Sequence, residues 1–461
     1  MLIQLLCCNE SFQVKAFVVL AKLTSHYKLG NLIVSISYLH ILKIKFILVL
    51  TFFIIGIFPA FGEPTLKDDT LVAKKFVSGL SRPTTMAFVD NDILVLQKDD
   101  GKVRLISNGV LQEKPVLDVS VSNDSERGLL GITTADSTVY LYFTESTVDG
   151  GQPLGNRIYR YAWDGQALAN PTLIKDLPAT PGPNHDGGAM VTGLDGTVYA
   201  VIGDLNRNGI LQNYPRGEPD DTGVILRVAP EGPYYAMGIR NSFGLEIDPV
   251  TGNLWQTENG PDDYDEVNLV LPNFNSGWET IMGPATESEL SLLPSFGDFV
   301  YSDPEFSWEE VVAPTALSFI DSKGFEKYKN SLFVGDCNFG NLYGFELNSD
   351  RTGFVFGDSA LADKVINAGE EMDEIIFGTG FGCITDLEVG PDGFLYVVSL
   401  THDAIYRITP KSMMVDEVQG IDSIIPIPYL EYIIMAGLII AAIIVLKMRS
   451  KNAMQSKSKT A

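Results

Sequence analysis

The stretch Asn184-His185-Asp186-Gly187-Gly188 combines the residue types that acid–base chemistry uses. The chain has only four histidines, and two of them, His26 and His40, lie in an N-terminal stretch that we do not expect to belong to the folded domain. A neutral imidazole is the usual general base near pH 7, and glycines let a backbone turn tightly beside a ligand. A lone histidine in a glycine loop is more often a turn residue, so the other motifs decide whether His185 is catalytic.

Three further stretches stand out beyond the pattern of strands and turns. Residues 125–131 read Ser-Glu-Arg-Gly-Leu-Leu-Gly and include Glu126. Residues 238–244 include Arg240 and Asn241, and residues 258–266 hold a Gly-Pro turn followed by a cluster of acids. Taken singly, the arginine could pair with acids of the domain, and the acidic cluster could be a solvated loop.

The elements that must position these residues are predicted to be strands. Between residues 68 and 410, short runs rich in Val, Ile, Leu, Tyr and Phe alternate with Gly, Asp, Asn and Pro turns. A similar unit of strands recurs six times, which predicts an all-β fold, a six-bladed β-propeller; a β-sandwich would not explain so many similar units. We expect residues 71–77 to complete the last blade, and 205–222 and 272–312 to be loop insertions on one face.

Both ends of the chain contain hydrophobic segments, which predicts a location outside the cytoplasm for the domain between them. Lys43 and Lys45 precede an apolar run at 46–58, so residues 1–62 are expected to be a leader or signal segment, with 1–38 as upstream sequence or a longer leader. The propeller domain is then 63–410, followed by a linker at 411–424, a transmembrane helix at 425–446 and a basic cytoplasmic tail at 447–461. The sequence thus predicts an extracytoplasmic domain anchored in the cell membrane.

Charge and cysteine content narrow the function further. The formal net charge of −25 opposes binding to nucleic acid and to anionic lipid headgroups, and it suits neutral substrates or cations. Cys337 and Cys383 remain once the leader is set aside, and outside the cytoplasm they could form one disulfide. Their separation in sequence does not tell whether they meet in space.

In this order and at this spacing, the four motifs resemble those of the soluble quinoprotein glucose/sorbosone dehydrogenases, also called aldose sugar dehydrogenases. The resemblance covers about residues 75–410. It implies a six-bladed propeller that holds pyrroloquinoline quinone (PQQ) and calcium in the loops at one end. It also implies oxidation of a sugar or another alcohol by hydride transfer to the quinone, with electrons leaving to an external acceptor.

The resemblance assigns a role to each motif. His185 falls on the position of the base that takes the hydroxyl proton, and Glu126 and Asn184 fall on sugar-contacting positions. Arg240 and Asn241 match the pair that contacts cofactor and substrate, so Arg240 would also stabilise charge in the reaction. The remaining matches concern the metal: the carbonyls of Gly260 and Pro261 as calcium ligands, and Asp265 and Glu266 as an acidic pair used structurally or for a second calcium. These roles agree with the chemistry, since hydride transfer needs a base and an electrostatic stabiliser, and a tricarboxylate cofactor suits positive charge and an oxygen-binding metal.

The chain departs from the family pattern on the opposite wall of the expected site. The usual Arg-x-Arg of the last blade is replaced by Cys383-Ile384-Thr385, and the usual Lys near Asn338 is absent. The resemblance places Cys337 and Cys383 near the same face, where a disulfide across the pocket is favoured over a soft-metal site with His185. The alternative function that follows is a non-enzymatic cell-surface propeller, a binding module that has lost the PQQ-binding cations.

Overall fold

The computed structural model describes residues 63–413. The predicted leader at 1–62, the transmembrane helix, the basic tail and nearly all of the linker lie outside the described residues and stay predictions. Within 63–413, no helix is long and apolar enough to cross a membrane.

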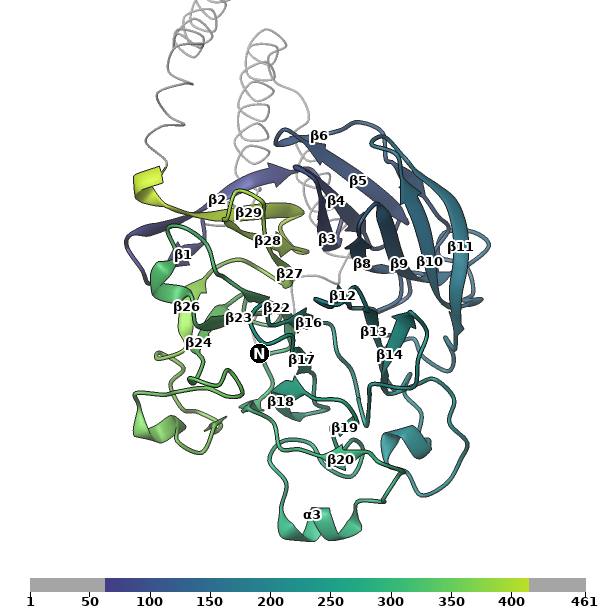
Figure 1. Ribbon diagram of the computed structural model, residues 1–461, viewed down its shortest axis with the longest axis vertical. Coiled ribbons are helices and arrows are strands. Elements are labelled where there is room, and N and C mark those ends of the chain that lie inside the picture. The colour runs from purple at the N-terminus through teal and green to yellow at the C-terminus, as the bar shows by residue number, and fades with distance from the viewer. Residues whose placement is uncertain (1–62, 414–461) are drawn as a thin grey trace, which may run out of the picture. The chain divides into compact units, whose positions relative to one another are not determined.

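The strands form six sheets that follow one another along the chain (Figure 1). The first sheet contains β3 (Pro83–Val89), β4 (Asp92–Gln97), β5 (Lys102–Ser107) and β6 (Val110–Leu111), with β7 (Leu117–Asp118) also paired to β5. The second contains β8 (Leu129–Ala135), β9 (Thr138–Glu145), β10 (Gly155–Trp163) and β11 (Leu168–Leu177). The third contains β12 (Met190–Thr192), β13 (Val198–Ile202), β14 (Val224–Ala229), β15 (Ala236–Met237), β19 (Phe274–Asn275) and β20 (Val300–Tyr301).

The last three sheets have five, five and four strands. The fourth contains β16 (Leu245–Ile247), β17 (Leu254–Glu258), β18 (Asp263–Val270), β21 (Phe306–Glu310) and β25 (Val365–Ile366). The fifth contains β22 (Pro314–Phe319), β23 (Ser331–Asp336), β24 (Leu342–Glu346), β26 (Ile376–Thr379) and β1 (Thr65–Leu66). The sixth contains β27 (Ile384–Val389), β28 (Leu395–Ser399), β29 (Ala404–Pro410) and β2 (Leu71–Ser78).

The inner strands of the six sheets contact one another in a closed ring, which defines a β-propeller. These strands are β3, β8, β12, β16, β22 and β27, and Figure 1 shows them gathered around the centre. A cluster of buried apolar side chains fills each of the six junctions between neighbouring sheets. Strands with many buried apolar residues need cover on both faces, and each sheet receives it from its two neighbours. The prediction of an all-β propeller is confirmed.

The ring closes with a strand from the N-terminal side of the domain. β2 pairs antiparallel with β29, in a register that runs from Leu71 opposite Pro410 to Ser78 opposite Ala404. The prediction that residues 71–77 complete the last sheet is therefore confirmed. This pairing joins the two ends of the domain, so that no inner sheet junction is left open.

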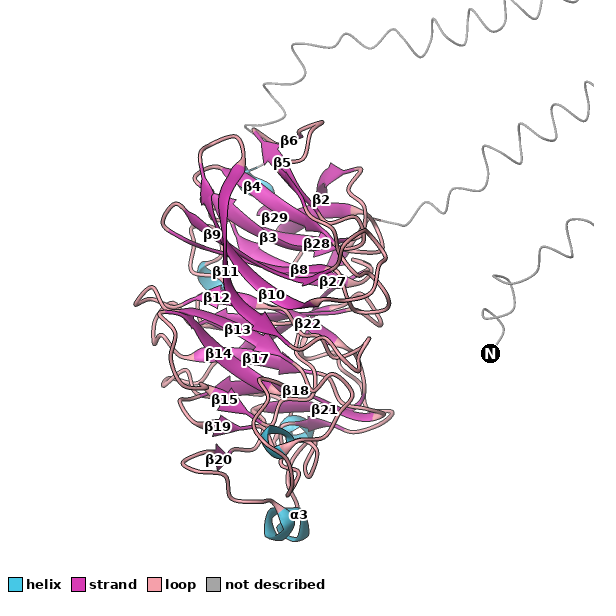
Figure 2. Ribbon diagram, turned by 90° about the vertical axis from the view of Figure 1, so that its right-hand side faces the viewer, coloured by secondary structure: helices cyan, strands magenta, loops and turns pink. Residues whose placement is uncertain are grey.

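The insertion at 272–312 is not the plain loop that the sequence predicts. It contains β19, β20 and β21, and the short helix α3 (Glu287–Leu292), which lies at one extremity of the domain in Figure 2. Thr286 and Glu289 form a reciprocal capping box that fixes the start of this helix. The insertion at 205–222 has one 3₁₀ turn, η1 (Ile210–Gln212); the other such turns are η2 (Glu326–Tyr328), η3 (Ser359–Leu361) and η4 (Lys411–Met413).

Candidate active site

A cavity of about 540 Å³ lies at one end of the propeller. Most of its lining residues lie just before or at the start of the first strand of a sheet, or just after the second strand, for example His185 before β12 and Gly260 after β17. Because these strands are antiparallel, the start of the first and the end of the second meet at the same edge. The volume lies within the roughly 300–1,000 Å³ typical of small-molecule sites.

Most of the residues singled out in the sequence meet in this cavity. Its lining includes Glu126, Asn184, His185, Arg240, Asn241, Gly260, Asp265, Cys337 and Cys383. Two predicted metal ligands, Pro261 and Glu266, do not line it. Pro261 is exposed, and the Glu266 carboxylate is buried among Asn268 and the Gly283 N–H instead.

The loop that presents His185 needs its glycines and a buried acid. His185 has φ 63°, and Gly187 and Gly188 also adopt positive φ values. A Cβ on Gly187 would lie 2.8 Å from the Val201 carbonyl oxygen, and one on Gly188 would lie 2.7 Å from Leu130 Cβ. Asp186 is fully buried and accepts a hydrogen bond of 2.9 Å from Asn156 Nδ2, which anchors the loop. Burial raises the pKa of Asp186 to about 6.

His185 is oriented by Asp204, which follows β13. Its Nδ1 lies 2.6 Å from Asp204 Oδ1, and the residue is 8% exposed. Since a carboxylate only accepts, Nδ1 carries the proton and Nε2 is left as the acceptor. Asn206 Nδ2 also approaches Nδ1, at 3.4 Å, but the much shorter contact with Asp204 decides the tautomer.

Asp204 is held in turn by two donors. The Trp278 indole N–H donates to Asp204 Oδ2 at 2.7 Å, and the Asn206 backbone N–H donates to Oδ1 at 2.7 Å. The face of the Trp278 ring lies 5.3 Å from the Arg240 guanidinium carbon, a cation–π arrangement. Trp278 therefore connects the carboxylate behind His185 to the cation beside the cavity.

Arg240 is packed among acids. Its backbone N–H donates to Glu258 Oε1 at 2.6 Å, and its guanidinium donates to the Asn259 carbonyl at 2.6 Å. Burial lowers its pKa, while the charges of Asp204, Glu258, Glu126 and Asp265 act in the opposite direction. The buried Glu258 has its pKa raised to about 7 by desolvation.

Glu126 ties the His185 loop to the Arg240 loop. Its Oε2 accepts the His185 backbone N–H at 2.5 Å and Asn241 Nδ2 at 3.1 Å. On the rim, Ser125 Oγ donates to Asn184 Oδ1 at 2.5 Å. Three motifs that are far apart in the sequence thus form one hydrogen-bonded wall.

Asp265 anchors the turn that contains Gly260. It accepts the N–H groups of Gly260 at 2.9 Å, Val312 at 2.6 Å and Ala313 at 2.7 Å. A Cβ on Gly260 would lie 1.9 Å from the Tyr264 carbonyl oxygen, so only glycine fits. Burial raises the pKa of Asp265 to about 6. Both carboxylate oxygens are taken by backbone donors, which is a structural role.

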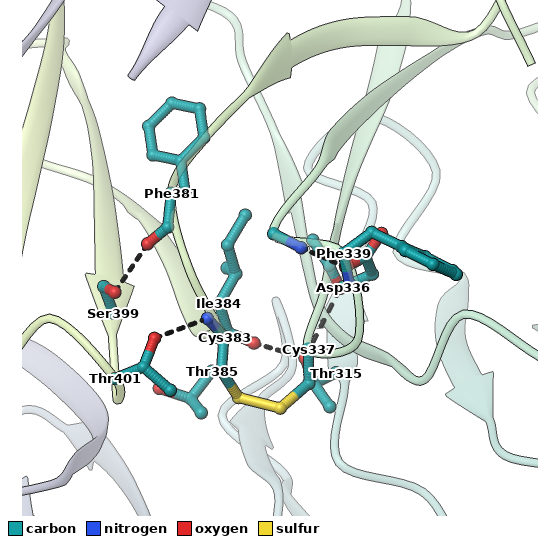
Figure 3. Close-up of a disulfide and its surroundings, with 12 residues drawn as sticks. Thr315, Asp336, Cys337, Phe339, Phe381, Cys383, Ile384, Thr385, Ser399 and Thr401 are labelled. Atoms are coloured by element: carbon teal, nitrogen blue, oxygen red, sulfur yellow. Dashed lines mark hydrogen bonds between the residues drawn. A yellow bond between two sulfur atoms is a disulfide. The ribbon is translucent and has the colours of Figure 1, made fainter. Parts of the chain in front are cut away.

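The opposite wall carries a disulfide between Cys337, just after β23, and Cys383, just before β27 (Figure 3). The Cys383 N–H donates to Thr401 Oγ1 at 2.9 Å, and Asp336 accepts the Phe339 and Gly340 N–H groups. The bond joins the fifth and sixth sheets at the cavity. With its sulfurs bonded to each other, this pair supplies no thiolate ligands for a metal.

The residues present fit an organic anion of the size and charge of PQQ. Arg82, Lys98 and Arg240 all line the cavity. Among the described residues, the Arg240 Nε–H is buried without a hydrogen-bond partner, so it can donate to such an anion. Within 63–413, no three His, Cys, Asp or Glu side chains are grouped to hold a metal, but the calcium ligands predicted at Gly260 and Pro261 are backbone carbonyls, which such a group does not include.

Four residues of the site were not assigned a role from the sequence: Asp204, Trp278, Arg82 and Lys98. Asp204 ends the Ile-Gly-Asp run directly after a strand, which is a signal that could have been used. Trp278 has the character of a core residue, and the two cations of the first sheet have no motif around them.

The chain is therefore a closed β-propeller with a small-molecule cavity and a histidine–carboxylate pair at its loop end. The chain belongs to the glucose/sorbosone dehydrogenase family, whose model matches residues 80–407.

Individual relatives agree with this family. Aldose sugar dehydrogenase YliI of Escherichia coli is 24% identical over 356 residues, which are 72% of this chain and 91% of that protein. Quinoprotein glucose dehydrogenase B of Acinetobacter calcoaceticus is 27% identical over 266 residues, covering 48% of this chain and 55% of that protein.

Solved structures show the same fold. A putative oxidoreductase (glucose dehydrogenase) from Thermus thermophilus is 26% identical with a TM-score of 0.59, covering 73% of this chain and 99% of that one. The PQQ-bound aldose sugar dehydrogenase from Streptomyces coelicolor is 23% identical with a TM-score of 0.56, covering 75% and 99%.

Proposed function

We propose that this chain is a PQQ-dependent dehydrogenase that oxidises a hydroxyl-bearing carbon of a sugar or a related alcohol. One observation carries the proposal: His185 lines the cavity with Nδ1 bonded to Asp204 at 2.6 Å, which leaves Nε2 free to accept a proton. Membership of the glucose/sorbosone dehydrogenase family gives this histidine its context.

Each residue of the site has a separate role in the proposed reaction. His185 takes the substrate hydroxyl proton, and Asp204 stabilises the imidazolium that results. Arg240 faces the cavity as a fixed positive charge that stabilises negative charge as it develops. Glu126 and Asn184 lie at the same wall and orient the sugar hydroxyls. PQQ, when bound, supplies the acceptor for the hydride equivalent.

The ends of the chain add a location to this proposal. The apolar run behind two lysines at 46–58 and the apolar segment 425–446 with its basic tail support an exported domain anchored in the cell membrane. The site would then act on sugars outside the cytoplasm, and the electrons would pass to an external acceptor.

The test is reconstitution of the purified full-length protein in detergent with PQQ, with and without added calcium. We expect the absorbance of bound quinone to appear and an artificial dye to be reduced when sugars are supplied. A panel of aldoses, sugar alcohols and simple alcohols would define the substrate. The absence of both bound quinone and dye reduction, in protein shown to be folded, would contradict the proposal.

A second function is favoured by the disulfide wall. Cys337 and Cys383 stand in the cavity where the family pattern places cofactor-binding cations. A propeller with this wall would serve as a cell-surface binding module for sugars without catalysis. In the reconstitution experiment it would bind sugars by calorimetry, bind no PQQ and reduce no dye.

A further inference from the structure

Arg82 and Lys98 lie side by side where the first sheet borders the cavity. Arg82 directly precedes β3 and Lys98 directly follows β4, and the Lys98 N–H donates to the Arg82 carbonyl at 3.1 Å. This bond extends the β3–β4 ladder past the pair Pro83 and Gln97 by one step. Both residues line the cavity. Their proximity is therefore fixed by the sheet.

The two cations share a single counter-ion. Arg82 Nε lies 2.8 Å from Asp99 Oδ2, and Lys98 Nζ lies 3.0 Å from Asp99 Oδ1. The Lys98 side chain is 7% exposed, so its charge is largely removed from water. Among the described residues, no other carboxylate forms an ion pair with either side chain, and several donors of each remain available. The Asp403 carboxylate accepts only the Arg82 backbone N–H, at 2.8 Å, so the two side-chain cations are ion-paired with one carboxylate between them, in a chain whose formal net charge is −25.

The positive charge of Arg240, the third cation of the cavity, is instead offset by the acids around it. Four acids act on its charge, and its guanidinium already donates to the Asn259 carbonyl. The excess positive charge of the cavity therefore lies at the first sheet, next to the sixth-sheet residues Cys383 and Thr385 on the lining. A buried lysine with an incomplete set of partners is stabilised by an added anion.

We propose that Arg82 and Lys98 form a carboxylate-binding subsite of the cavity. Asp99 lowers the affinity of this subsite, because its carboxylate competes with the ligand for the two cations. The carboxylate can come from PQQ, in which case the subsite rests on the proposed function, or from an acidic sugar such as a uronate. Either source would fix the orientation of the bound molecule, with its anionic end toward the first sheet and the remainder toward His185.

The test measures binding by titration calorimetry with the full-length protein, so that turnover is not needed. The ligands are PQQ and, without PQQ, glucuronate and glucose. The variants are Arg82→Gln, Lys98→Met and the two combined, with Arg82→Lys as the charge-preserving variant. Lys102→Met is the matched control, because Lys102 is a first-sheet lysine paired with Asp100 at 2.8 Å and lies outside the cavity lining. Thermal unfolding of each variant shows whether it is folded.

We expect the combined variant to bind the carboxylate ligand with a Kd at least about tenfold higher than that of the wild type. The Kd values of Arg82→Lys and Lys102→Met should stay within about threefold of the wild-type value. Asp99→Asn should instead tighten binding, because it removes the competing carboxylate. A purely structural role of these residues would not give opposite changes in Kd.

The outcomes separate the subsite from the proposed function. If the wild type and all variants bind PQQ with equal affinity, the carboxylates of PQQ do not bind at Arg82 and Lys98. The titrations with glucuronate then decide whether the subsite binds a carboxylate. If the wild type binds no PQQ, the proposed function fails, while a preference for glucuronate over glucose that the combined variant loses still supports the subsite. The proposed subsite would be overturned if the wild type and the combined variant bound both anions with equal affinity, or if neither anion bound at all.

Discussion

Nδ1 of His185 lies 2.6 Å from Oδ1 of Asp204, and this one contact determines which imidazole nitrogen is available to a substrate. The second oxygen of Asp204 accepts the Trp278 indole N–H at 2.7 Å, so the carboxylate cannot rotate away without losing a partner. The ring of His185 is therefore held in place from behind. A base with a fixed tautomer and a fixed position loses little entropy when the substrate binds.

Replacing Asp204 with Asn should lower kcat about 100-fold or more and change KM little. The amide can donate to Nδ1 and so stabilise the tautomer that has its proton on Nε2, which cannot accept. The measurement is steady-state dye reduction by the reconstituted enzyme over a range of sugar concentrations. Asp176→Asn is the matched control, since Asp176 pairs with Arg157 on the outer strands of the second sheet. A kcat close to that of the wild type would show that Asp204 does not set the tautomer.

Replacing His185 with Gln should lower kcat by about 10²–10⁴-fold, the usual contribution of a general base. Adding Asp204→Asn to His185→Gln should cost little more, because Asp204 acts through the imidazole. The double-mutant cycle in kcat measures this coupling. Full activity of His185→Gln would remove the base assignment while leaving the rest of the site intact.

The fold could be predicted from the sequence because it depends on a repeated local pattern. Six units of apolar strands and polar turns require six sheets that cover one another, and residues 71–77 have the composition of the missing strand. The strands within 272–312 could not be predicted, because β19 and β20 have two residues each and pair in parallel with neighbours remote in sequence. Short strands of this kind are determined by tertiary contacts.

The candidate site was predictable where a motif held several of its residues together. His185, Glu126 and Arg240 belong to three such motifs, and the structure brings them to one wall. The position of Glu266 shows where prediction from the motif fails. Neighbouring side chains of a strand point to opposite faces of the sheet, so two adjacent acids cannot both face the cavity. Asp265 faces the cavity, whereas Glu266 points into the interior toward Asn268. Arg82 and Lys98 were missed because their proximity exists only across the β3–β4 ladder.

Breaking the disulfide should lower the free energy of unfolding by about 2–4 kcal/mol, because the bond closes a loop of 46 residues in the unfolded chain. Urea unfolding of Cys337→Ser/Cys383→Ser against the wild type measures the difference. The wild type should show the same loss in the presence of dithiothreitol, whereas the double variant should not respond to the reductant. A double variant that unfolds at the same urea concentration as the wild type would contradict the expectation.

Three carboxyl groups, Glu246, Asp386 and Glu388, face a second cavity of about 280 Å³ among the inner strands of the propeller. Desolvation is the largest cause of a raised pKa at each of them, and the charge of Asp386 raises the pKa of Glu246 and Glu388 further. The pKa of Glu246 rises to about 8 and that of Asp386 to about 7. This second cavity lies next to the candidate active site, since Thr85 and Phe243 line both.

The sign of the resulting pH dependence follows from these raised pKa values. Each carboxyl binds its proton more tightly in the folded chain than in the unfolded one, where its pKa is about 4. The stability it contributes is fully present below about pH 4 and is lost as the pH rises through its folded pKa, up to about pH 8 for Glu246. The midpoint temperature of thermal unfolding should therefore decrease as the pH rises from about 5 to about 8.

Calorimetry without ligand measures this decrease, and two variants locate its source. Glu388→Gln should make the decrease smaller, because a neutral amide removes one titrating and repelling group from the second cavity. The exposed Glu346→Gln on β24 is the matched control and should leave the decrease unchanged. A midpoint that instead rises with pH over this range would show that the three carboxyls are already ionised in the folded protein, with partners that stabilise their charge.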